Sequence, residues 1–169
     1  LGFPGSVMSL DGVHVEWINC PWKWAFNCTG KEGYPTLMWN VGVDRHKLIV
    51  WIFGPQHGAR NDKTVAGLDD LVQDLKYKRR PLFANFKFNL RRTDGTTHVE
   101  TGVYSITDGG YHFWRCLMCG NSKAGHKFAA RFAKRMESVR KDPECSFGIV
   151  KKRFACLSYG LRFRKPSQH

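Results

Sequence analysis

Two aspartates each follow a short apolar stretch and are themselves followed by glycine, as acids at the ends of β-strands often are. Asp11 stands in the segment Ser-Leu-Asp-Gly, and Asp108 in Ile-Thr-Asp-Gly-Gly. A carboxylate at a strand end is held rigidly at the edge of a sheet, and hard divalent ions such as Mg²⁺ prefer such oxygen ligands. Asp-Gly pairs also form plain turns, as we expect for Asp94 and Gly95. The pattern therefore indicates either a metal site or two turns.

A third acid, Glu144, lies in a helical pattern one turn before Phe147 and Gly148. This places Glu144 beside the apolar face of the helix, so that its carboxylate can point along the sheet. Glycine at position 148 lets the helix backbone approach its neighbour closely. Two strand-borne aspartates and one helix-borne glutamate would supply a site for divalent ions. The simpler alternative is an acid near a helix start, where it complements the helix dipole.

The chain is strongly basic. Its 169 residues include 27 Lys and Arg against 14 Asp and Glu, which gives a formal charge of +13 and a pI of about 9.8. This excess favours a polyanionic partner, nucleic acid before an anionic membrane surface. The cations that we assign to DNA phosphates are Lys23, Lys78, Arg79, Arg80, Arg91, Arg92, Lys151, Lys152 and Arg153. For any one of these clusters, a solvated surface is an equally good explanation.

Cys116 and Cys119 have the spacing of half a zinc site, with His112 and His126 nearby. A structural zinc ion needs four ligands, usually from two such pairs, and the sequence has no second CxxC pair. Buried, reduced cysteines are therefore favoured over bound zinc. The irregular spacing of the six cysteines indicates a reducing compartment rather than a disulfide framework.

The elements that must position these residues follow from the apolar periodicity, which alternates between that of strands and that of helices and is typical of an α/β fold. Strands are predicted over residues 7–17, 36–43, 48–53 and 104–107, and a hairpin over 83–90 and 97–103. Residues 19–35 are predicted to form a loop.

Two helical regions are predicted. The first runs from Asn61 and Asp62 through Lys76, and the Asn-Asp pair is interpreted as its cap, so we do not assign Asp62 to catalysis. The second begins at His126, with a kink or break over residues 141–143 because Pro143 interrupts the pattern.

We expect residues 1–169 to form one domain, since a chain of this length buries a sizeable core. The longest apolar run, residues 48–53, is far shorter than the roughly 20 residues that span a bilayer, so no membrane partner is expected. The first residues contain neither an initiator Met nor an apolar leader, which suggests a piece of a longer protein.

Five blocks of sequence carry a family resemblance. They are residues 4–14 (PGSVMSLDGVH), 19–21 (NCP), 58–62 (GARND), 107–111 (TDGGY) and 140–148 (RKDPECSFG), the last continuing to 152–154. In this order they resemble the DDE endonuclease domain of PIF/Harbinger transposases, a group that includes plant transposon proteins. The resemblance runs from about Pro4 to Phe163. It implies an RNase H-like fold, a central mixed sheet flanked by helices.

The resemblance also implies a mechanism. Asp11 on the first central strand, Asp108 after the fourth and Glu144 on the following helix would hold two Mg²⁺ or Mn²⁺ ions about 3.5 to 4 Å apart, with Asp11 bridging both. The implied reactions are strand cleavage at the element end and strand transfer into target DNA. Double-stranded DNA is the implied partner, the nucleus the implied location, and a homo-oligomer a possible assembly.

Some family features are expected to lie outside this chain, namely an upstream helix-turn-helix region and a closing C-terminal helix. Pro143 also stands where the family continues one helix. A domesticated, catalytically inactive module that binds DNA or protein is therefore the main alternative function. A zinc-stabilised nucleic-acid-binding protein is the third.

Overall fold

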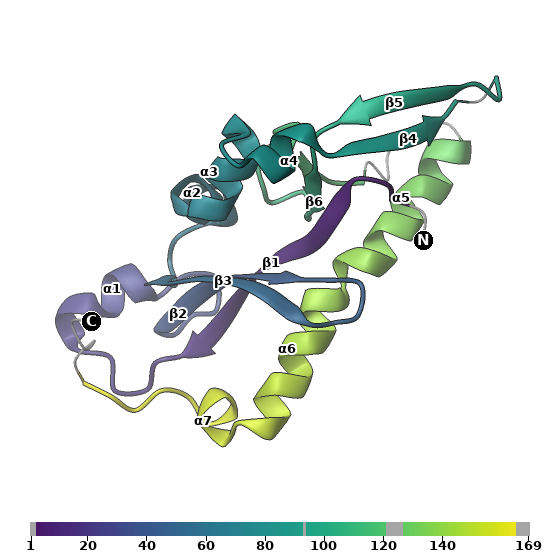
Figure 1. The fold of residues 1–169 in the computed structure, drawn as a ribbon. Coiled ribbons are helices and arrows are strands. Elements are labelled where there is room, and N and C mark those ends of the chain that lie inside the picture. The colour runs from purple at the N-terminus through teal and green to yellow at the C-terminus, as the bar shows by residue number, and fades with distance from the viewer. Residues whose placement is uncertain (1–2, 93, 121–126, 165–169) are drawn as a thin grey trace.

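A central sheet with helices on both sides organises the molecule (Figure 1). The computed structural model describes residues 3–92, 94–120 and 127–164. The strands in these residues are β1 (Ser6–Glu16), β2 (Thr36–Val43), β3 (Ile49–His57), β4 (Lys87–Arg91), β5 (Thr97–Thr101), β6 (Tyr104–Ile106) and β7 (Leu117–Met118). The helices are α1 (Trp22–Cys28), α2 (Asp62–Leu68), α3 (Asp70–Tyr77), α4 (Pro81–Asn85), α5 (Lys127–Arg140), α6 (Asp142–Arg153) and α7 (Ala155–Ser158).

The main sheet has five strands in the order β3-β2-β1-β6-β7. Strands β1, β2 and β3 pair in antiparallel fashion, whereas β6 is parallel to β1 and β7 is parallel to β6. The predicted strands 7–17, 36–43 and 48–53 are confirmed as this antiparallel meander, and β2 has the predicted bounds. The sheet is therefore mixed, and β1 lies at its centre.

Alternate residues of β1 face opposite helical layers, because successive side chains of a strand point to opposite faces. Met8 and Leu10 pack in one cluster with residues of α2 and α3. Val13 packs with Phe147 of α6, and the Ser9 hydroxyl donates to the Val139 carbonyl of α5 at 3.1 Å. Helices thus cover both faces of a five-stranded mixed sheet, which is the RNase H-like arrangement that the sequence predicts.

The first helical region is divided in two, where one continuous helix was predicted. Asn61 caps α2 as expected, accepting from the Thr64 amide at 2.8 Å. The chain then leaves the helical conformation at Asp69, whose carboxylate accepts from the amides of Leu71 and Val72 and so caps α3. A side chain that offers the backbone such an alternative partner favours a cap over a helix interior. The prediction of one helix is wrong at this residue.

The second helical region breaks where Pro143 predicts. Helix α5 ends at Arg140 and α6 begins at Asp142, with the proline in its first turn, a position that needs no amide donor. Lys141 keeps helical dihedral angles. The two helices consequently follow one another nearly in line along one side of the sheet (Figure 1). His126, where the sequence analysis begins this region, lies outside the described residues.

Two predictions about the periphery need correction, and one strand was not predicted. Residues 22–28 of the expected loop form the helix α1, and residues 81–85 form α4, so the first strand of the predicted hairpin starts only at Lys87. The short edge strand β7 had no sequence signal. The hairpin itself is confirmed, with β4 and β5 paired from Lys87↔Thr101 to Arg91↔Thr97. In the described part of the chain, no helix is both long and apolar enough to span a bilayer.

Candidate active site

Asp11 and Asp108 come together because β1 and β6 pair in parallel. Asp11 does not end a strand, as the sequence predicted, but lies in the middle of β1, where it pairs with Val41 of β2. Ser9 pairs with Ile106, and Asp11 and Asp108 each follow two residues later. The short strand β6 ends at Ile106, beside the middle of β1, and this register brings the two carboxylates together at the carboxyl edge of β6.

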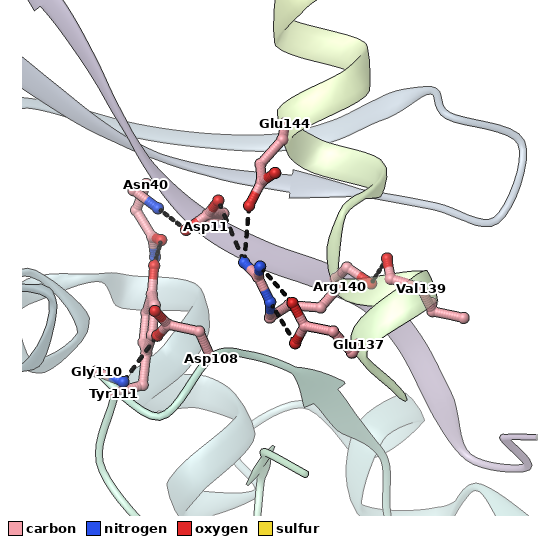
Figure 2. A network of polar contacts seen from close by, with 11 residues as sticks. Asp11, Asn40, Asp108, Gly110, Tyr111, Glu137, Val139, Arg140 and Glu144 are labelled. Atoms are coloured by element: carbon pink, nitrogen blue, oxygen red, sulfur yellow. Dashed lines mark hydrogen bonds and ion pairs between the residues drawn. The ribbon is translucent and has the colours of Figure 1, made fainter. Parts of the chain in front are cut away.

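A short loop after β6 holds Asp108. Its carboxylate accepts from the Gly110 amide at 2.9 Å, and the backbone then turns toward Tyr111. The buried Tyr111 hydroxyl donates to the Asn40 side chain of β2 at 2.7 Å, and Asn40 donates to Asp69 at 2.6 Å. These contacts tie the Asp108 loop to the centre of the sheet and to the start of α3 (Figure 2). Burial, foremost, raises the pKa of the Tyr111 phenol well above its usual range, so Tyr111 is a neutral donor in this network.

Asp11 is largely buried at this edge. Burial is the main cause that raises the pKa of its carboxyl to about 6, and the charges of Asp108 and Glu144 raise it further. The Gly12 amide, which donates to the carboxylate at 2.9 Å, and the Arg140 guanidinium act in the opposite direction. Acids that repel one another at the edge of a sheet favour the binding of a cation.

Glu144 reaches the site from the first turn of α6 and meets Arg140 there (Figure 2). Nη1 of Arg140 donates to Glu144 at 2.9 Å and lies 3.9 Å from the Asp11 carboxylate. Nε and Nη2 of the same arginine donate to the two oxygens of Glu137 at 3.0 and 2.8 Å. Glu144 is thus directed toward Asp11, as the sequence analysis expects, but an arginine lies between the two carboxylates.

Asp62 is the site residue that sequence reasoning missed. A Cβ atom added to Gly110 would lie 2.9 Å from an oxygen of Asp62 and 3.0 Å from an oxygen of Asp108, so the two carboxylates converge on the same small space. A Cβ atom on Gly12 would lie 2.7 Å from the other Asp62 oxygen. Burial, followed by the charge of Asp108, raises the pKa of Asp62. The available signal in the sequence was the pair of glycines Gly12 and Gly110, which lie near Asp11 and Asp108 and leave the space beside Asp62 free of side chains.

The donors at this edge suit a hard divalent ion. Asp11, Asp62, Asp108 and Glu144 offer only carboxylate oxygens, and Gly110 leaves the space between two of them free of a side chain. Among the described residues, no group of three His, Cys, Asp or Glu side chains is close enough to bind one ion in the observed conformation. The chemistry of these donors thus suits divalent ions, but in the observed conformation the carboxylates do not converge on one ion, and Glu144 is engaged by Arg140.

A polar cleft of about 460 Å³ opens beside Asp11 and Glu144. His14 lies in its wall and shares a hydrogen bond of 3.0 Å with the Thr36 hydroxyl, in keeping with a supporting role. Burial lowers the pKa of the His14 imidazole. Lys151 of α6 also lines the cleft and donates to the His14 carbonyl at 3.2 Å. Lys151, one of the cations assigned to DNA, therefore lines the same cleft as Asp11 and Glu144.

The other cations assigned to DNA occupy several elements. Lys152 and Arg153 end α6, and Arg91 ends β4 with Arg92 directly after it. Lys23 lies over the Trp24 ring at 5.6 Å in α1, and Lys78 follows α3. Arg80 and Arg79 pair with Asp74 at 2.7 and 3.9 Å, which already compensates part of their charge.

The cysteine pair lies at the β7 edge of the sheet. Cys116 is buried and Cys119 is half-buried, and both are free thiols. Burial raises the pKa of the Cys116 thiol, which disfavours the thiolate that a metal ion requires. The possible ligand His112 instead stacks on Trp114 at 4.2 Å and shares a hydrogen bond with the Lys63 carbonyl. The other possible ligand, His126, is outside the described residues.

Comparison with known families addresses the origin of this site. The family model described as "Plant transposon protein" matches residues 1–165. The chain belongs to the plant transposon protein family. No curated protein and no solved structure matches it. The match spans the whole acid-bearing edge and nearly the full sheet and helix assembly of this plant transposon protein.

Proposed function

We propose that this chain is the catalytic core of a PIF/Harbinger-type transposase, a DDE endonuclease that cuts and joins DNA. One observation carries the proposal: in a transposon-derived chain, Asp11 in β1 lies beside Asp108 at the end of the parallel strand β6, with Glu144 directed toward Asp11 from α6. Hard-cation ligands on three different elements are what metal-dependent phosphodiester chemistry requires.

The acids would act together. Asp11, central on the sheet and rigidly placed, would hold two Mg²⁺ or Mn²⁺ ions together with Asp108 and Glu144. When bound, such ions activate the attacking water or 3′-hydroxyl and stabilise the leaving oxygen at phosphorus. Asp62 adds a carboxylate beside Asp108. The Tyr111 and Asn40 hydrogen bonds keep the Asp108 loop in place, so that Asp108 itself needs little reorganisation.

The basic chain would hold double-stranded DNA across this edge. With a formal charge of +13, phosphate contacts supply a large, sequence-independent part of the affinity. Lys151 in the cleft would contact DNA nearest the acids, and the remaining clusters would contact flanking phosphates. A nuclear location follows from DNA as the substrate.

A second function has an observation in its favour. Arg140 lies within ion-pair distance of Glu144 and Asp11, so part of the negative charge of this arrangement is compensated without a divalent ion. This favours a domesticated module that has kept the fold and the basic surface for binding but does not cut DNA.

Cleavage of supercoiled plasmid separates the two functions. Purified protein is incubated with Mg²⁺ or Mn²⁺, beside an EDTA control and the variants Asp108→Ala and Asp94→Ala. Asp94 is the matched control, because it also precedes a glycine but lies in the exposed turn after β4. We expect metal-dependent nicking by the wild type and by Asp94→Ala, and a loss of at least about 100-fold in Asp108→Ala. DNA binding without nicking at any metal concentration would favour the binding module.

A further inference from the structure

Arg140 is the most completely paired cation of the candidate site. Only 15% of its side chain is exposed, whereas those of its glutamate partners Glu137 and Glu144 are about half exposed (52% and 49%). An arginine can donate five N–H groups in a fixed plane. Here Nε and Nη2 donate hydrogen bonds to the two oxygens of Glu137. These two bonds fix the direction in which the third nitrogen points.

That third nitrogen, Nη1, faces the site. It donates to Glu144 at 2.9 Å and lies 3.9 Å from Asp11 (Figure 2). Its positive charge therefore lies between two carboxylates that would otherwise repel each other. The same carboxylates are the ones that must converge on a divalent ion if the chain cuts DNA. While Nη1 holds one oxygen of Glu144, the positive charge of Arg140 competes with a divalent ion for this carboxylate.

We propose that Arg140 is a substrate-positioning residue: Nη1 holds Glu144 beside Asp11 in the ion-free protein, releases it when a divalent ion binds, and then binds a phosphate oxygen of DNA. This inference rests on the proposed endonuclease function. Arg140 stays ordered when it releases Glu144, because Nε and Nη2 remain hydrogen-bonded to Glu137. Nη1 then faces the site without a carboxylate partner, and the phosphodiester is the anion that enters there. Arginine is well suited to such contacts, because it stays charged and donates in a plane.

Two substitutions of this one ion pair should shift ion affinity in opposite directions. Arg140→Gln removes the competitor for Glu144, so Mn²⁺ should bind roughly tenfold more tightly, equivalent to about 1.4 kcal/mol. Glu137→Gln leaves Arg140 in place with less compensation of its charge, so Glu144 is held more strongly and Mn²⁺ should bind several-fold more weakly. A merely structural role for the pair would weaken Mn²⁺ binding in both variants.

The measurement is Mn²⁺ titration without DNA, followed by electron paramagnetic resonance of the free ion, with circular dichroism to confirm that each variant is folded. Arg115→Gln is the matched control, because Arg115 also pairs with a glutamate, Glu100 at 3.0 Å, but not with the acids of the site. This control should leave Mn²⁺ affinity unchanged. Plasmid nicking then supplies the second readout: Arg140→Gln should raise KM at least about fivefold despite its tighter hold on the ion.

The outcomes separate this inference from the function on which it rests. Tighter Mn²⁺ binding together with a raised KM in Arg140→Gln supports it. If the wild type binds Mn²⁺ and nicks DNA, but Arg140→Gln binds Mn²⁺ no more tightly or keeps its KM, Arg140 has no such role while the endonuclease stands. If neither the wild type nor Arg140→Gln binds Mn²⁺, the endonuclease and this inference are both overturned.

Discussion

At the scale of single residues, the acids of the site oppose the stability of the ion-free protein. Asp11 is desolvated and lies near Asp108 and Glu144, and the raised pKa of its carboxyl measures this cost. Nearby, Asp62 and Asp108 approach a common space that only glycine leaves open. Groups in such an arrangement are usually kept for a ligand rather than for the fold, because neutral residues would pack there at lower cost.

Asp11→Asn should therefore stabilise the ion-free chain, most of all at neutral pH. Because the folded-state pKa of about 6 exceeds the ordinary aspartate pKa of 3.8, the favourable contribution of the protonated acid is complete below pH 3.8 and is lost as the pH rises through 6. Complete loss corresponds to about 3 kcal/mol, of which about 1.4 kcal/mol falls between pH 5 and 7.5.

Urea unfolding in EDTA at pH 5 and pH 7.5 checks this expectation. The stability difference between Asp11→Asn and the wild type should grow with pH, and comparing the two proteins cancels the titration of other groups. A difference that is constant, or that shrinks toward pH 7.5, would contradict the account of Asp11. Excess Mn²⁺ should reverse the order at pH 7.5, because only the wild type keeps the ligand.

At the scale of elements, the junction between α2 and α3 organises the sheet behind the site. The buried Asp69 carboxylate accepts from two amides of α3, from Asn40 of β2 at 2.6 Å and from the Trp51 indole of β3 at 3.1 Å. Burial raises the pKa of Asp69, against the opposing effect of these hydrogen bonds. Through Asn40 and Tyr111 the same network reaches the Asp108 loop. One residue thus joins a helix cap, two strands and the loop that carries Asp108.

Asp69→Ala should destabilise the chain by roughly 3 kcal/mol or more, since it removes a cap and leaves buried donors unpaired. Asp70→Ala is the matched control, because Asp70 is exposed in the first turn of α3 and should cost less than about 1 kcal/mol. Urea unfolding at pH 7 gives both values. Equal effects of the two substitutions would show that Asp69 acts only through the helix dipole.

At the scale of the whole molecule, the basic charge is not equally available to a polyanion. Arg79 and Arg80 share Asp74 as a partner. The cations at the end of α6 have no carboxylate partner among the described residues, and they follow the helix that carries Glu144. We therefore expect these cations of α6, which have no carboxylate partner in the described part of the chain, to be the best placed to bind DNA near the site.

Salt titration of duplex DNA binding tests this distribution. Replacing Lys151, Lys152 and Arg153 together by Gln should lower the slope of log K against log salt by up to about 3, at about 0.9 per phosphate contact. Replacing Arg79 and Arg80 together should lower it by about 1, because Asp74 already compensates one of the two charges. Fluorescence anisotropy in EDTA measures both slopes without cleavage. Equal losses per cation would show that the ion pairs with Asp74 do not persist on DNA.

The sequence alone determined what depends on local pattern and composition. Apolar alternation predicted β1, β2 and β3, Asn61 predicted the start of α2, and Pro143 predicted the break before α6. The excess of Lys and Arg leads us to expect a polyanionic partner, which stays a prediction. The Asp-Gly pairs drew attention to Asp11 and Asp108, although Asp11 lies inside β1 and not at its end. Each of these signals lies within a few residues, where chain geometry and side-chain preference act directly.

The tertiary structure decided what depends on strand order and on side chains from distant segments. The parallel pairing of β1 with β6 brought residues 11 and 108 to one edge, a register that no local pattern contains. From the sequence, Asp62 was interpreted as part of a helix cap, because its neighbours in the chain explain it fully. In the structure its carboxylate lies against Gly12 and Gly110. In the sequence Arg140 is one cation among many, and only the folded structure places it between Asp11 and Glu144. Spacing along a chain fixes which residues can share a helix face or a strand, whereas their partners across the sheet are fixed by packing.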